Sequence, residues 1–174
     1  LADAKAWIER DYAKQFGGGK YAEIKTYTDY REMLQDKSID AVLISTPDHW
    51  HAEPAMEAAL AGKDVFLQKP ASLTIREGRQ MAEVIRRTGR ILQIGSQQRS
   101  SANFRLGCEL VRNERIGKLK EVYIGLPTDP PGGNPKEMPV PPNLNYDMWL
   151  GSTPFVYYTE DRVHPQSDNI MRRY

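Results

Sequence analysis

The chain has 174 residues, with 24 basic and 23 acidic side chains and a formal net charge of +1. This balance gives no case for nucleic acid or an anionic membrane as partner, and no apolar run approaches the roughly 20 residues of a membrane span. The length suits one domain, or one domain and part of another, and the single Cys108 excludes an intramolecular disulfide.

The chain opens with a predicted amphipathic helix over residues 1–16, where apolar side chains recur at helical spacing. Three glycines end this helix. We do not interpret them as a phosphate loop, because they follow a helix and no helix opens directly after them. A short strand is expected near residues 23–27. Asp29 and Glu32 then resemble a capping box for a helix through Gln35.

Residues 39–70 predict a strand, a helix and a second strand. Residues 41–44 are apolar without alternation, which suits a strand buried on both faces of a parallel sheet. Asp48 is a candidate N-cap for a helix over 49–61, and a second strand is expected over 64–67. Two strands joined in this way form a βαβ unit, whose crossover is almost always right-handed.

Two further helices and two further strands are predicted downstream. A capping box opens a helix over 74–88, and a strand over 91–94 follows it. A helix is expected over 103–114 and a half-exposed strand over 119–126. The side chains expected to face inward from the later helix are Phe104, Cys108 and Val111.

The composition changes after residue 126. Seven of the sixteen residues from 127 to 142 are proline, which predicts an extended loop. Residues 146–150 (YDMWL) predict a short ordered piece closed by Gly151. Residues 153–174 show little periodicity.

Polar side chains follow each of the three predicted parallel strands. Ligands bind beyond the carboxyl ends of strands in such sheets, so a site at this edge is expected. His49 and His51 do not suggest a metal site, because their spacing of two on a helix turns them apart and no cysteine or acidic cluster joins them. We expect no metal. The Lys69–Pro70 bond is a candidate for the cis form.

Four motifs occur in order along the chain: TPDHWH, QKP, GSQQRS and YDMWLG. Together they resemble the Gfo/Idh/MocA family of nicotinamide-dependent sugar oxidoreductases, typified by glucose–fructose oxidoreductase and inositol dehydrogenase. The resemblance implies an α/β fold. Residues 1–117 would be part of a Rossmann-like, dinucleotide-binding domain, and residues 118–174 the start of an α/β substrate and oligomerisation domain. It also implies an NAD(P)-dependent dehydrogenase, a small sugar or cyclitol substrate and a homo-oligomer.

The same resemblance implies roles for individual residues. Lys69 matches the catalytic lysine of the family's Glu-Lys-Pro motif, and Gln68 departs from its acid. The implied cofactor contacts are Ser45, Thr46, Pro47, Asp48, His51, Gln68, Lys69 and Gln97. The implied substrate contacts are Gln98, Arg99 and His164. Without the resemblance, Lys69 reads as a solvated strand-end lysine and Arg99 as a surface charge.

Two family segments have no match in the sequence. These are the initial strand with G-x-G-x-x-G, which holds the pyrophosphate, and the downstream D-x-x-x-H segment with the catalytic histidine. The chain therefore looks like the middle of a longer protein. Its cofactor, NAD or NADP, and its location, cytoplasmic or periplasmic, stay open. Two alternative functions also stay open: an NAD-dependent glycosidase or lyase, and a non-catalytic binding protein.

Overall fold

A computed structural model describes residues 2–16, 24–126 and 136–163 of the chain. Its centre is a parallel sheet in the order β1-β2-β3, formed by β1 (Ala41–Ile44), β2 (Asp64–Gln68) and β3 (Leu92–Gly95). Ile44 is paired with Leu67, and Gln68 with Gly95. This confirms the predicted α/β class.

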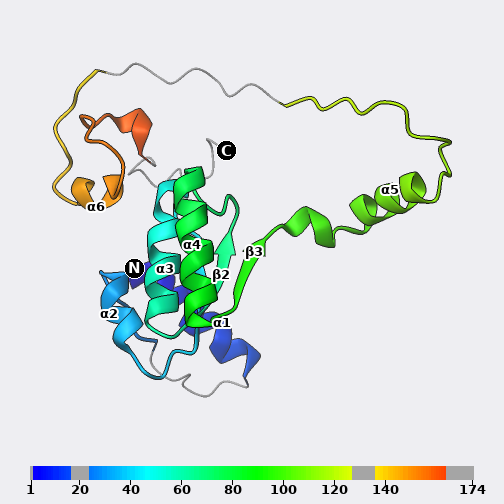
Figure 1. The fold of residues 1–174 in the computed structure, drawn as a ribbon. Helices are drawn as coiled ribbons and strands as arrows, with labels where there is room; N and C mark the ends of the chain where they lie inside the picture. Colours follow the sequence, from blue (N-terminus) through cyan, green and yellow to red (C-terminus); the bar gives the residue numbers. More distant parts are fainter. Residues whose placement is uncertain (1, 17–23, 127–135, 164–174) are drawn as a thin grey trace.

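Helices α3 (Ala52–Leu60) and α4 (Ile75–Thr88) lie side by side on one face of this sheet (Figure 1). The capping box predicted for α4 is present, since Thr74 and Glu77 each bond the other's backbone N–H. Gly89 ends the helix in the left-handed conformation, at a φ of 66°. Helices α1 (Ala2–Gln15) and α2 (Tyr30–Gln35) precede the sheet.

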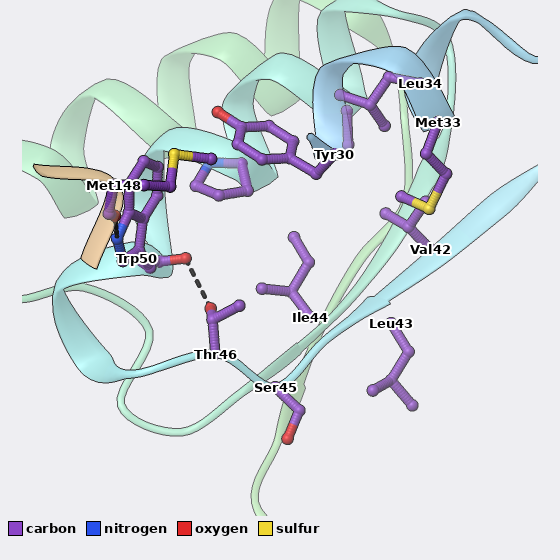
Figure 2. A pocket seen from close by; sticks show the side chains of 12 residues that line it. Tyr30, Met33, Leu34, Val42, Leu43, Ile44, Ser45, Thr46, Trp50 and Met148 are labelled. Atoms are coloured by element: carbon purple, nitrogen blue, oxygen red, sulfur yellow. Dashed lines mark hydrogen bonds between the residues drawn. The ribbon is translucent and has the colours of Figure 1, made fainter. Parts of the chain in front are cut away.

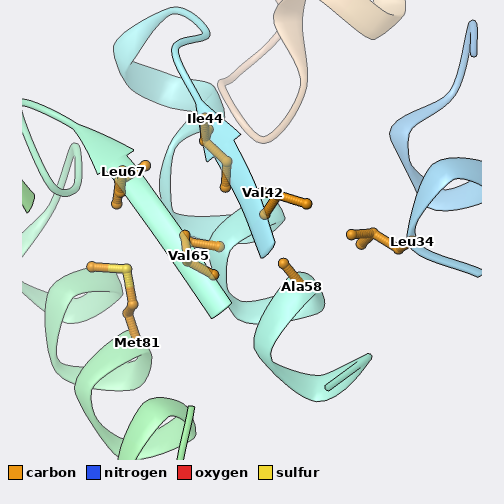
Figure 3. Packing of buried hydrophobic residues seen from close by; sticks show 8 residues of the cluster. Leu34, Val42, Ile44, Ala58, Val65, Leu67 and Met81 are labelled. Carbon is orange, nitrogen blue, oxygen red and sulfur yellow. The ribbon is translucent and has the colours of Figure 1, made fainter. Parts of the chain in front are cut away.

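One hydrophobic core lies between the sheet and the helices, as Figure 3 shows. Strand residues Val42, Ile44, Val65 and Leu67 face it, with Met81 of α4 closing one side. The remaining buried members are Leu34, Ala55 and Ala58. Small alanines at the contact allow α3 to lie close to the strands, and Leu67 is completely buried.

The opposite face of the sheet is not covered by any described residue. The burial of β1 alternates along the strand, and Leu43 is 70% exposed while Phe66 on β2 is 41% exposed. The prediction of a strand buried on both faces was therefore wrong for this part of the protein. The physical reason is that the described helices lie on one face only, although the apolar run of the sequence suits two covered faces.

Asp36, which follows α2, organises the connection into β1. Its carboxylate accepts hydrogen bonds from the Lys25 ammonium at 2.7 Å, from Ser38 and from the Tyr27 hydroxyl. These hydrogen bonds, that of Lys25 first, hold the pKa of the Asp36 carboxyl well below its usual range. The buried Lys63 donates to the Asp36 carbonyl at 2.8 Å. Residues 24–27 therefore form an irregular segment held by side chains, not the predicted strand.

Two predictions for the later part of the chain were also wrong. Helix α5 (Ala102–Arg112) forms, but the side chains expected to face inward are exposed, Phe104 by 57%. Residues 118–126 form no strand and are exposed. Apart from the adjoining residues 97–100 beside α5, no described element packs on either segment, and neither an inward helix face nor a strand exists without a neighbour.

Residues 136–163 contain the short helix α6 (Tyr146–Leu150), as predicted, which ends at Gly151. A small cluster of Tyr146, Leu150, Tyr158 and Val163 is buried around it. Among the residues with a described structure, no helix is both long and apolar enough to cross a membrane.

Candidate functional site

The three strand ends meet at one edge of the sheet because the strands are parallel and in register. Residues 45–51 follow β1, the Lys69–Pro70 pair follows β2, and the 3₁₀ helix η2 (Gln97–Ser100) follows β3. The Lys69–Pro70 bond is cis, as predicted. Polar residues from all three turns thus lie at the carboxyl edge of the sheet, as expected from the sequence.

The turn after β1 is closed by hydrogen bonds of its own. The Thr46 hydroxyl donates to the Trp50 carbonyl at 2.7 Å (Figure 2), and the Trp50 N–H donates to the Pro47 carbonyl at 2.8 Å. Residues Asp48–Trp50 thus form a 3₁₀ helix, η1, and α3 begins only at Ala52. The prediction of Asp48 as the N-cap of α3 was wrong. Asp48 lies inside η1, and the cap position is His51.

His51 joins this turn to the next one. Its ring is 1% exposed. Nδ1 lies 2.5 Å from the Pro70 carbonyl oxygen and Nε2 lies 2.8 Å from the Thr46 carbonyl oxygen. The two carbonyls belong to the turns after β2 and β1, so one side chain connects both strand ends.

Gln68 and Lys69 lie at the end of β2. Gln68 Oε1 accepts the Lys69 N–H at 2.9 Å, which leaves the amide NH₂ group to donate to a ligand. A Cβ on Gly95 would lie 2.5 Å from the same Oε1 atom, so this side-chain position depends on glycine at the end of β3. The Lys69 side chain is exposed.

A hollow of about 620 Å³, lined by both polar and apolar residues, runs along β3 and the end of β2. It brings together three of the predicted site residues, Gln68, Gln97 and Arg99. Gln98 lies with Arg99 in a neighbouring hollow beside α5, and Lys69 lines neither one. His164 lies outside the described residues.

A second cavity, apolar and about 270 Å³ in volume, lies between β1, α2 and α6. Figure 2 shows Tyr30, Ile44 and Met148 around it, with Thr46 at its polar end. Ser45 also lines it, although its side chain points away from the cavity centre (Figure 2). Burial, with a contribution from Glu57, raises the pKa of the Tyr30 hydroxyl, so this group stays protonated and uncharged.

The helix α6 contacts the first turn directly, about 100 residues away in sequence. His49 Nε2 lies 2.6 Å from the Trp149 carbonyl oxygen, and Trp50 Nε1 donates to the Met148 carbonyl at 2.8 Å. Gly151 lies against the Trp50 indole. Sequence reasoning did not identify this contact: His49 was considered only as a metal ligand and Trp50 not at all. No side-chain pattern indicates it, because the acceptors are main-chain carbonyls.

This arrangement is that of a nucleotide-binding α/β protein: a parallel sheet with polar turns at its carboxyl edge. A family model described as "Oxidoreductase family, NAD-binding Rossmann fold" (GFO_IDH_MocA) matches residues 6–96. A model of that family's C-terminal alpha/beta domain matches residues 132–170. The chain belongs to the Gfo/Idh/MocA oxidoreductase family.

The similar proteins include inositol dehydrogenases and a 1,5-anhydro-D-fructose reductase of Ensifer adhaerens. Myo-inositol 2-dehydrogenase of Thermotoga maritima is 33% identical over 122 residues, which is 70% of this chain and 34% of that protein. The NAD⁺-dependent scyllo-inositol 2-dehydrogenase of Bacillus subtilis is 37% identical over 87 residues, 50% of this chain and 24% of that protein.

The solved structures agree with the sequence relatives. The crystal structure of myo-inositol 2-dehydrogenase from Lactobacillus plantarum is similar with a TM-score of 0.51 and 35% identity, over 62% of this chain and 31% of that one. The matched part of the chain thus covers about a third of the length of these proteins.

Proposed function

We propose that the protein is an oxidoreductase that transfers a hydride between NAD or NADP and a hydroxyl group of a sugar or cyclitol. The observation that carries the proposal is the position of Lys69. It follows β2 at the carboxyl edge of a domain whose family binds NAD, next to the hollow lined by Gln68 and η2. The related proteins named as inositol dehydrogenases support the substrate class.

The residues present fit the nicotinamide half of such a cofactor. The Gln68 NH₂ group can donate to a ribose oxygen, and Gln97 and Arg99 add donors within the same hollow. Thr46, Pro47, Asp48 and His51 form the neighbouring turn, with Ser45 before it. No G-x-G-x-x-G occurs among the 174 residues, so these residues do not account for pyrophosphate binding.

The bound nicotinamide supplies the hydride chemistry, and the protein supplies orientation and proton transfer. Lys69 would accept the proton of the reacting hydroxyl as the carbon is oxidised, and return it to the oxygen as the carbonyl is reduced. Gln98 and Arg99, on η2, would bind the other hydroxyls of the substrate. His164 is a further proposed substrate contact. A homo-oligomer is proposed for the whole protein, by analogy with the family.

The test compares three variants of the whole protein in NAD(P) reduction with a panel of inositols and aldoses. Lys69→Ala should lower kcat about 10²- to 10⁴-fold, the range of lost acid–base catalysis, with the cofactor Kd changed little. Lys69→Arg should not restore activity, because an arginine cannot give up its proton. Lys37→Ala is the matched control, an exposed lysine before the amino end of β1. Full activity of Lys69→Ala would contradict the assignment.

Two further measurements, aryl glycoside cleavage and thermal shift with cofactor, separate the two alternatives. An NAD-dependent glycosidase or lyase would cleave an aryl glycoside without net NADH. A non-catalytic binding protein, which the replacement of the family's acid by Gln68 favours, would give no turnover and no thermal shift with either nicotinamide cofactor.

A further inference from the structure

The His51 ring lies between two hydrogen-bond acceptors. Both ring nitrogens face main-chain carbonyl oxygens, that of Pro70 at 2.5 Å and that of Thr46 at 2.8 Å. Carbonyl oxygens accept hydrogen bonds and cannot donate them. Each of the two contacts therefore needs an N–H on the ring.

A neutral imidazole has one N–H and one lone pair. Either neutral tautomer would place a nitrogen lone pair against a carbonyl oxygen at hydrogen-bonding distance, which is repulsive. Water cannot easily relieve this repulsion, because the ring is 1% exposed. Only the imidazolium, which donates from both nitrogens, satisfies the two contacts.

We propose that His51 carries both ring protons in the folded protein and, as an imidazolium, holds the turn after β1 and the turn after β2 at a fixed separation. Pro70 directly follows Lys69, so His51 acts as a positioning residue for that lysine. This second part rests on the function proposed above, whereas the protonation state does not.

A buried imidazolium is energetically acceptable at this position only because both of its N–H groups donate hydrogen bonds. Burying an unpaired charge is costly, and His51 is also at the N-cap of α3, where the helix dipole disfavours positive charge. Two charge-assisted hydrogen bonds oppose these costs. If either carbonyl moved away, the imidazolium would lose its main stabilisation, so the ring proton and the spacing of the turns depend on each other.

The ionisable groups on the surrounding elements do not supply a competing partner. Asp48 and His49 lie on η1, Glu53 on α3 and Lys69 before Pro70. Glu53 bonds Arg31 at 2.9 Å, and His49 contacts the Trp149 carbonyl. Within the described part of the chain, the hydrogen bonds of the His51 ring go to carbonyls alone.

The first experiment measures the protonation of the ring directly. Whole protein with ¹⁵N-labelled histidine is examined by long-range ¹H–¹⁵N correlation at neutral pH, and the His51 signals are assigned as those lost in His51→Phe. Two protonated ring nitrogens are expected. A signal from one unprotonated nitrogen would overturn the proposal, whatever the enzyme's activity.

The second experiment tests the positioning role through a double-mutant cycle. His51→Phe keeps a ring of similar size and donates no hydrogen bond, and should lower kcat about 10- to 100-fold, as expected for a misplaced catalytic group. In a Lys69→Ala background it should have little further effect on kcat. An equal loss in both backgrounds would mean that His51 does not act through Lys69.

The two readouts separate the failure of each idea. If the protein shows no dehydrogenase activity but both ring nitrogens are protonated, the proposed function is wrong and the imidazolium stands. If His51→Phe fails to fold, the spectrum of the wild-type protein still decides the protonation state, with His51 assigned by elimination from variants of the other histidines, His49→Phe and His164→Phe among them.

Discussion

Replacing Gly151 with alanine should destabilise the contact between α6 and the turn after β1. Gly151 has φ 56° and ψ −126°, a conformation that side chains with a Cβ rarely adopt. A Cβ at this position would also lie 2.6 to 2.8 Å from three atoms of the Trp50 indole. The substitution therefore combines backbone strain with a direct collision.

The magnitude follows from the geometry. Ordinary contact begins near 3.4 Å, so the indole or the helix must move by about 0.8 Å from the nearest distance of 2.6 Å. Overpacking of this kind costs about 1–3 kcal/mol, and loss of the Trp50–Met148 hydrogen bond about 1 kcal/mol more. Gly89→Ala is the matched control, with φ 66° and no atom within 4 Å of the added Cβ. Its cost should be only the backbone penalty, about 1–2 kcal/mol.

Urea unfolding of both variants, followed by tryptophan fluorescence and far-ultraviolet circular dichroism, measures the difference. Gly151→Ala should lose about 2–4 kcal/mol more than Gly89→Ala, from the terms above. If α6 detaches before the core unfolds, the fluorescence transition should precede the dichroism transition, because Trp50 and Trp149 both lie in the contact. Equal losses in the two variants, with coincident transitions, would refute the steric argument.

Of three further predictions, two use matched positions. Gly95→Ala should displace the Gln68 amide and raise the KM for cofactor several-fold in the proposed assay. Gly107→Ala is the control, because nothing lies within 4 Å of the added Cβ. It should leave KM unchanged and stabilise α5 by about 0.5–1 kcal/mol. Asp36→Asn should lower the free energy of unfolding at neutral pH. Because the pKa of Asp36 is lowered in the folded protein, its carboxylate stabilises the fold above about pH 4, and this stabilisation is lost as the carboxyl is protonated. Urea titrations should therefore show the deficit of the variant shrinking as the pH falls below about 4, and a deficit independent of pH would contradict this. Leu67→Ala should cost about 2–5 kcal/mol in the same unfolding assay and Leu43→Ala, on the exposed face, below about 1 kcal/mol; similar losses would mean that the exposed face is covered in the whole protein.

The elements from β1 to β3 could be predicted because local rules and the tertiary fold agree there. The apolar run before Ser45, the capping box of α4 and the glycine at residue 89 each specify a boundary without knowledge of distant residues. The same reasoning failed for residues 118–126. Their alternation is typical of a strand, but a strand exists only when another strand bonds to it.

The grouping of polar residues at the carboxyl edge of the sheet could be predicted, but their hydrogen-bond connections could not. Strand ends predict which residues share an edge, so Gln68, Gln97 and Arg99 could be expected together. The hydrogen bonds of His51 to two turns and the contact of Trp50 with α6 depend on main-chain carbonyls, which leave no mark on side-chain patterns.

The contact between His49 and Trp149 has a consequence for the order of folding. The strands and helices from α2 to β3 meet within a short stretch of chain, whereas this contact closes a loop of 100 residues. Loop closure over that length has an entropic cost that the local unit does not carry. During synthesis the ribosome completes the βαβ core long before Trp149 emerges, so the first turn remains without its α6 partner for that interval. The α6 contact therefore forms late, on a scaffold that is already folded.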